Sequence, residues 1–493
     1  MLNTQTETFR GYGKIGELNA QTAVECRFGG EVETVLSAHA SAVLVSAEAD
    51  NGEVRYTGRA HFSIVYEDAD RKVCRAEKGV EFSAKAQSEN CCPAYTARVK
   101  LETENLSVRR EGASVYLSAL FGADIVLYGE QSFEYLTDGD LICKRESLPV
   151  LTAHLCSGSA ETDDEFETEF VGDILLHAET VALTDVSCET GVLRAEGEVN
   201  LNILAVKGEN SLVSFERLVP FKVEIPCEAA AYGHSAEARV SVTSVTLHAD
   251  SDEEQGKCKI VAELTLFAEG CVYEETEIDA VVDAFSPTNA VKLSTSKTES
   301  MSAGNAVRLT ERVSGKAALS SSVDFSDVLQ AVTLQRAEAS VTHTDGVRVE
   351  GLAMATLLVL GTDGSHRGVE ISLPFSVPVT AEGDCSVSVL ACGGQARQKQ
   401  EGEIDAEFTL KISVHQQKKT GITAVCAVEE GEALPVCDSA VSVYIPRAGD
   451  GLWELAKSLK KPPEEVAASN PDLEFPIKEG QRVVVYRKKS LNA

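Results

Sequence analysis

The residue pattern with the clearest chemical meaning is a glycine-rich run near the N-terminus. Residues 11–16 read GYGKIG and match the pattern G-x-G-x-x-G. In a dinucleotide-binding site, such a run joins a buried strand to a helix whose first backbone amides bind the pyrophosphate. Here the preceding residues 4–8 are polar, and no alternation of strands and helices follows. The sequence therefore predicts no nucleotide cofactor, and nothing in it points to another cofactor.

Other candidate catalytic and metal-binding residues are scattered along the chain. The 14 cysteines contain no C-x-x-C pair, and the nine histidines are isolated from one another. The sequence lacks a G-x-S-x-G elbow, an H-E-x-x-H motif and a P-loop. We expect the cysteines to be reduced and to pack as small hydrophobic residues. The sequence thus predicts no catalytic site, no metal site and no enzymatic activity.

Charge and hydropathy exclude several classes of partner. The formal net charge is −32 at pH 7, which disfavours non-specific binding to nucleic acid or to an anionic membrane surface. Residues 1–10 lack the apolar segment of a signal peptide. No apolar stretch reaches the ~18 residues that a membrane span requires. We therefore expect a cytosolic protein that binds no nucleic acid and does not insert into a membrane.

The C-terminal residues predict a small module of two strands and two helices. An apolar helix face is indicated by Leu452, Leu455, Ala456 and Leu459. Asp450 follows a glycine and is expected to cap this helix. Pro463 suits the first position of a second helix, which should end before residues 470–471, an Asn-Pro pair. A strand near Tyr444 and another at residues 483–486 complete a βααβ order.

This order and the motif YIPRAGD at residues 444–450 resemble a LysM module. Members of that family bind N-acetylglucosamine polymers or, in some lineages, a protein. The resemblance implies a shallow ligand groove between the loop after the first strand and the loop after the second helix. Mapped onto this chain, the partner-binding residues are Gly449, Asp450, Gly451, Leu452, Trp453, Asn470, Pro471, Ile477 and Lys478.

The kind of ligand depends on the loop chemistry. LysM modules usually carry Ser or Thr after the Gly-Asp pair, where this chain has Gly451. A hydroxyl group that could bind a sugar is therefore missing. Together with the expected cytosolic location, this favours a protein ligand, and peptidoglycan or another N-acetylglucosamine polymer is the alternative.

The rest of the chain contains three copies of one β-rich pattern. Each copy has an alternating strand that contains a glycine, followed by a phenylalanine 24 residues later. The pairs are Gly58 and Phe82, Gly197 and Phe221, and Gly351 and Phe375. A glycine on the apolar phase of a strand indicates a bulge or a close approach of another group to the backbone. The regular spacing predicts that each copy folds in the same way.

Period-2 alternation in these copies predicts antiparallel strands with one buried and one solvated face. The predicted fold class is mainly β, with three repeated antiparallel β-sandwich-like domains followed by the βααβ module. The expected domain boundaries are residues 1–150, 151–290, 291–436 and 437–493. Residues 157–169, 294–305 and 429–432, which are rich in small or acidic residues, are expected to be linkers.

Repeated β domains followed by a LysM-like module resemble the SipL-type sporulation proteins, which are built from SPOCS domains. The resemblance implies a non-enzymatic adaptor for spore-coat assembly in the mother-cell cytosol, at the forespore surface. It also implies that the LysM module binds the coat ATPase, stage IV sporulation protein A. A peptidoglycan- or cortex-binding protein is the alternative, and a hydrolase with a LysM targeting arm is a third hypothesis.

Overall fold

A computed structural model describes residues 3–112, 114–168, 172–208, 211–252, 256–343, 346–399, 402–435 and 441–486. Strands account for 78% of the structure and helices for 3%. Every strand pair in the described residues is antiparallel. The predicted mainly β, antiparallel class is therefore confirmed.

The first six strands form two three-stranded sheets, which together we call the first unit. The strands are β1 (Thr4–Phe28), β2 (Val32–Asp50), β3 (Glu53–Asp68), β4 (Val73–Gln87), β5 (Thr96–Glu111) and β6 (Ser114–Gly139). One sheet has the order β2-β3-β4, and the other has the order β1-β6-β5. The last strand thus lies between the first and the fifth.

The next strands repeat this topology twice. The second unit contains β7 (Ile142–Thr168), β8 (Ile174–Glu189), β9 (Val192–Lys207), β10 (Ser211–Pro226), β11 (Ser235–Asp252) and β12 (Lys257–Phe285). The third contains β13 (Asn289–Lys316), β14 (Ala318–Leu319), β15 (Val328–Thr342), β16 (Arg348–Leu360), β17 (His366–Pro378), β18 (Cys385–Gln398) and β19 (Ile404–Ala433). Their sheets have the orders β8-β9-β10 and β7-β12-β11, then β15-β16-β17-β14 and β13-β19-β18.

Within each unit, the two sheets bury apolar side chains against each other. In the second unit, Leu201 of β9 and Leu264 of β12 belong to one buried cluster. In the third unit, Leu357 of β16 and Phe408 of β19 share another. In the first unit, Phe62 of β3 and Phe121 of β6 do the same. Burial of alternate residues on facing strands is what the period-2 pattern predicts.

The repeated glycine and phenylalanine lie directly opposite each other on neighbouring strands. Gly58 pairs with Phe82, Gly197 with Phe221, and Gly351 with Phe375. A Cβ atom on Gly197 would lie 2.6 Å from the Phe221 ring and 2.3 Å from the carbonyl oxygen of Ala182. The constant spacing of 24 residues is therefore a pairing register, and the predicted close approach at the glycine is confirmed.

The polar face predicted for the second copy is partly buried. Asn200 and Asn202 are 0% and 2% exposed, although they alternate with the core residues of β9. The Asn200 amide donates to the carbonyl oxygen of Ala391 at 3.2 Å, and Gln335 donates to Asn202 at 3.3 Å. The prediction of a solvated face was wrong here because the third unit packs against it.

The same face of the middle strands packs into a buried cluster that all three units share. Val65, Leu204 and Leu358 lie on the middle strands β3, β9 and β16, and all three belong to one buried cluster. Each lies seven residues after the repeated glycine of its copy. Equivalent positions of the three copies therefore meet, which joins the three units through one shared core.

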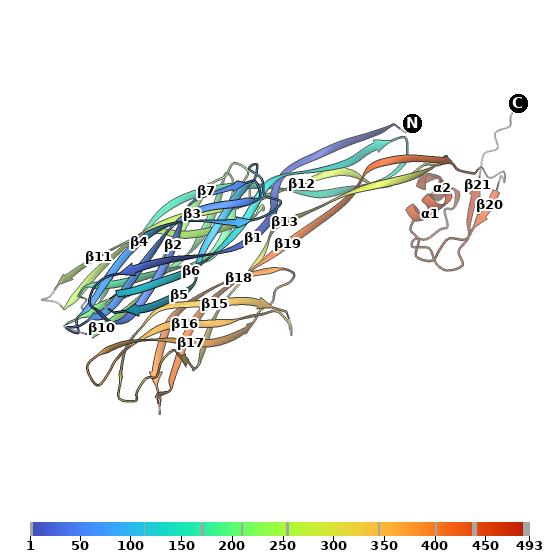
Figure 1. Cartoon of the computed structure of the whole chain (residues 1–493). Helices are drawn as coiled ribbons and strands as arrows, with labels where there is room; N and C mark the ends of the chain where they lie inside the picture. The colour runs from blue at the N-terminus through green and yellow to red at the C-terminus, as the bar shows by residue number, and fades with distance from the viewer. Residues whose placement is uncertain are drawn as a thin grey trace.

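A three-ribbon stalk extends from the three units (Figure 1). It consists of the paired ends of β1 with β6, β7 with β12, and β13 with β19, at residues 4–12, 130–152, 274–300 and 420–433. Apolar side chains of different ribbons pack inside it, among them Tyr135, Val150 and Ile422. The stalk leads towards the C-terminal module (Figure 1).

The three predicted linkers were wrong, because they lie within strands. Residues 157–168 belong to β7, 294–305 to β13 and 429–432 to β19, and residue 169 lies outside the described residues. In β7 these residues alternate between half-buried and exposed. The small and acidic side chains that suggested a linker therefore include the solvent-facing positions of a long strand.

Candidate functional site

The C-terminal module follows the element order expected from its sequence. It contains β20 (Val441–Tyr444), α1 (Leu452–Leu459), α2 (Pro463–Ser469) and β21 (Val483–Tyr486), and β20 pairs with β21. The predicted apolar face of α1 is confirmed, because Leu455 and Ala456 are fully buried and Leu452 and Leu459 pack beside them. None of the helices in the described ranges is long and apolar enough to cross a membrane.

The helix ends match the sequence predictions at two of three points. Pro463 is the first residue of α2, and Asn470 caps its C-terminus, as expected. The first cap was predicted wrongly, because Gly451 and not Asp450 precedes α1. The Gly451 amide donates to the Glu454 carboxylate at 3.0 Å, whereas Asp450 accepts from the amide of Arg447. A negative charge still lies at the positive end of the helix.

The structure brings the two predicted groove loops together. The Gly449 amide donates to the Ile477 carbonyl at 2.8 Å, and the Ile477 amide donates to the Asp450 carbonyl at 2.9 Å. Gly451 and Leu452 continue directly from the first loop into α1. The two chain segments that the LysM resemblance singled out are therefore neighbours in space.

The predicted groove residues Ile477 and Asn470 make contacts inside the module. The Ile477 side chain is 3% exposed in the module core. The Asn470 side chain donates to the carbonyl oxygens of Val466 and Val484 and accepts from the Val484 amide at 2.8 Å. Asn470 thus connects α2 to β21, and these contacts engage both its amide nitrogen and its carbonyl oxygen.

Other groove residues face solvent. Gly449, Pro471 and Lys478 are exposed, and Lys478 forms an ion pair with Glu474 at the surface. Phe475, which the sequence analysis did not single out, is exposed between them in the chain. An exposed aromatic side chain is of a kind that is enriched at protein interfaces.

Trp453 contacts the stalk and not only its own module. Its indole nitrogen donates to Asp283 of β12 at 2.8 Å, and its ring lies 5.3 Å from the ring of Phe285. Lys457, one helical turn further along α1, donates to both oxygens of Asp283 at 2.6 and 2.8 Å. Phe285 is fully buried among the core residues of the module.

The charge of Asp283 is stabilised by these contacts. Partial burial opposes ionisation, but the hydrogen bonds from Lys457 and Trp453 hold the pKa of the carboxyl group below its usual value. Sequence reasoning missed Asp283 and Phe285, because Asp283 lies 170 residues before Trp453 and both belong to a strand of ordinary alternation. No local signal connects them to the module.

The face of the β20–β21 pair that points away from the helices is apolar and exposed. Val441, Val443 and Ile445 alternate along this face and are 54%, 61% and 69% exposed. Val484, which pairs with Val443 and so lies on the same face, is half-buried. The buried residues Val483 and Val485 occupy the opposite face, under the helices. One face of this strand pair is therefore apolar and exposed to water.

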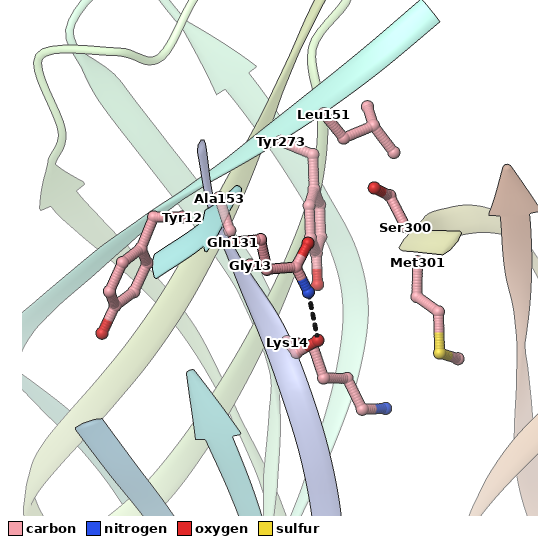
Figure 2. A pocket seen from close by; sticks show the side chains of 9 residues that line it. All are labelled: Tyr12, Gly13, Lys14, Gln131, Leu151, Ala153, Tyr273, Ser300 and Met301. Atoms are coloured by element: carbon pink, nitrogen blue, oxygen red, sulfur yellow. Dashed lines mark hydrogen bonds between the residues drawn. The ribbon is translucent and has the colours of Figure 1, made fainter. Parts of the chain in front are cut away.

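The glycine-rich run lies inside a strand. Residues 11–16 belong to β1 and pair with β6, so they do not form a turn into a helix. Beside them, at the base of the stalk, residues of all three units line a cavity of about 10 Å³ (Figure 2). Gln131 is one of the lining residues and donates to the Lys14 carbonyl oxygen at 3.0 Å. Such a volume holds about one water molecule.

Two cysteine thiols are held in their protonated form. Burial raises the pKa of the Cys156 and Cys271 thiols to about 12, so both are protonated near neutral pH. The described part of the chain holds no group of three or more His, Cys, Asp or Glu side chains arranged to bind a metal ion. A shallow depression lined by Asn19, Gln21, Glu104 and Asp124 lies on the first unit.

The fold and this site define a repeated β protein with a small mixed module at the end of its stalk. Residues 31–111 match the family model described as SipL, SPOCS domain. The match covers β2 to β5 of the first unit and supports a resemblance to SipL-like sporulation proteins. No curated protein and no solved structure matches the chain significantly.

Proposed function

We propose that the protein is a non-enzymatic adaptor in the assembly of the spore envelope. The observation that carries this proposal is the match of residues 31–111 to the SipL, SPOCS domain family. The strand order of that region recurs in β8–β11 and in β15–β18. We therefore extend the SPOCS-like assignment to three β-sandwich domains, each corresponding to one unit.

The C-terminal module is the proposed docking part of the adaptor. Its βααβ order and its two adjoining loops support a LysM-like assignment. Its proposed partner is a coat ATPase like stage IV sporulation protein A, at the forespore surface in the mother-cell cytosol. Because Ile477 and Asn470 are used in structural contacts, we assign partner contact to Gly449, Pro471, Phe475 and Lys478.

The proposal is tested by capture of the purified coat ATPase on the immobilised full-length chain. Lys478→Glu reverses an exposed charge in the proposed surface, and we expect it to weaken capture about three- to tenfold. Lys292→Glu is the matched control, because Lys292 is equally a surface lysine paired with a glutamate, but on the stalk. Equal affinities of the two variants would contradict this surface.

A sedimentation assay with purified peptidoglycan separates the adaptor from the glycan-binding hypothesis. We expect the full-length chain to remain in the supernatant and to bind the coat ATPase. Co-pelleting with peptidoglycan, together with failure to capture the ATPase, would replace the proposed protein ligand by an N-acetylglucosamine polymer.

A further inference from the structure

The end of β12 supplies part of the core of the C-terminal module. Phe285 is the last residue of this strand, and it is buried with Leu455 and Ala456 of α1 and Val466 of α2. Lys460 also lies over its ring, 5.7 Å from the centroid. The second unit therefore contributes an aromatic side chain to a module that follows the third unit in the sequence.

A local irregularity directs Asp283 towards the same module. The register between β12 and β7 shifts between Val281 and Asp283, which is the mark of a bulge. A bulge changes the direction of the side chains that follow it. Asp283 accepts hydrogen bonds from Trp453 and Lys457, which lie one turn apart and so share one side of α1.

The polar part of this contact is accessible to water. The side chains of Asp283 and Lys457 remain 27% and 40% exposed, so water competes for their ion pair. An ion pair this accessible contributes only modestly to stability. The apolar face of α1 and the buried residues of α2 and β21 belong to the module itself.

We propose that the end of β12 is a latch that holds the C-terminal module against the stalk and covers the Trp453 side of α1. Asp283 is its polar contact and Phe285 its apolar contact. When the latch opens, Trp453 is exposed while both helices remain folded. A partner that binds the Trp453 side of the module must therefore displace the stalk. The latch is independent of the proposed function, because it is a contact within one chain.

The test uses the fluorescence of Trp453, the single tryptophan of the chain. Asp283→Lys places a positive charge opposite Lys457. In the full-length protein, we expect a red-shifted emission and a rise of about twofold in the acrylamide quenching constant, because a half-buried indole becomes exposed to solvent. Adding Lys457→Asp restores an ion pair of reversed polarity and should return the quenching constant towards that of the unmodified chain.

Asp279→Lys is the matched control, because Asp279 is an exposed carboxylate on the same strand. Unchanged quenching in Asp283→Lys, or failure of the second substitution to restore it, overturns the latch. Hydrogen–deuterium exchange of residues 452–469 separates opening from unfolding. Protected helices support the latch, whereas fast exchange shows that the contact is part of a single folding unit. Neither measurement needs a partner. A failure of the latch can therefore be distinguished from a failure of the proposed function.

Discussion

At the residue scale, the most informative feature is the glycine that faces a phenylalanine. In the second copy, the Phe221 ring and the Ala182 carbonyl occupy the space in which a side chain would begin at Gly197. The backbone there is ordinary strand, so the requirement for glycine is one of space and not of dihedral angle. The phenylalanine covers the glycine and restores the apolar surface that a missing side chain would leave open.

We expect Gly197→Ala to lower the free energy of unfolding by about 1–3 kcal/mol, because the added methyl group overpacks this contact. The measurement is the urea midpoint of the full-length chain. Gly158→Ala in β7 is the matched control, because the nearest atoms to its added Cβ lie at an ordinary 3.6 Å. Equal effects of the two substitutions would contradict the role assigned to the pair.

At the scale of elements, the first part and the end of β12 pack against different parts of the molecule. Its first part packs in the core of the second unit, and its end reaches the module through Asp283 and Phe285. The groups around Asp283 are Lys457 and Trp453 on α1, Lys144 on the paired strand β7, and Glu454 near Lys144. Lys457, Trp453 and Lys144 favour the charged form of the Asp283 carboxylate, whereas Glu454 opposes it.

The contact between β12 and α1 should therefore depend on pH. The pKa of Asp283 is lowered when the module is docked. The charge of Asp283 therefore contributes fully to the stability of docking above the ordinary aspartate pKa of about 3.9. This contribution is lost as the pH falls through the lowered value. We expect Trp453 emission to shift to the red on acidification below pH ~4.

Asp283→Asn is the control for this titration, since asparagine keeps an acceptor for the indole but does not titrate. Its emission should be less dependent on pH in the same window. A titration identical to that of the unmodified chain would assign the change to other carboxyl groups.

At the scale of the whole molecule, the three units depend on one another. Leu204 is fully buried in the central cluster, which also contains residues of the first and third units. We expect Leu204→Ala to destabilise the chain by about 2–5 kcal/mol, the usual cost of such a cavity. Thermal and urea unfolding monitored by circular dichroism measure this effect.

Leu352→Ala makes the same chemical change at a position that is 40% exposed. We expect this substitution to change the free energy of unfolding by no more than about 0.5 kcal/mol, as is usual at the surface. If Leu204→Ala were as mild as this control, the three units would be held together by contacts other than the central cluster.

Much of the local structure could be predicted from the sequence, because it depends on neighbouring residues. Alternation predicted the strands that contain Gly58, Gly197 and Gly351, and helical spacing predicted α1. The role of Asp450 was predicted less well, since both Asp450 and Gly451 suit a helix start and only backbone geometry decides between them. The linkers failed because composition alone does not distinguish an exposed strand face from a loop.

Sequence patterns were therefore sufficient to predict the strands around the three glycines, the two helices and the constant spacing between each glycine and its phenylalanine. What covers the second face of β9 depends on how the units pack against one another. Asn200 and Leu204 lie on that face, and both are buried by contacts with another unit. The tertiary structure also decided that Trp453 faces Asp283 of the stalk. The periodicity of a sequence indicates which residues share one face of a helix or strand. Contacts between residues 170 positions apart depend instead on how whole units pack.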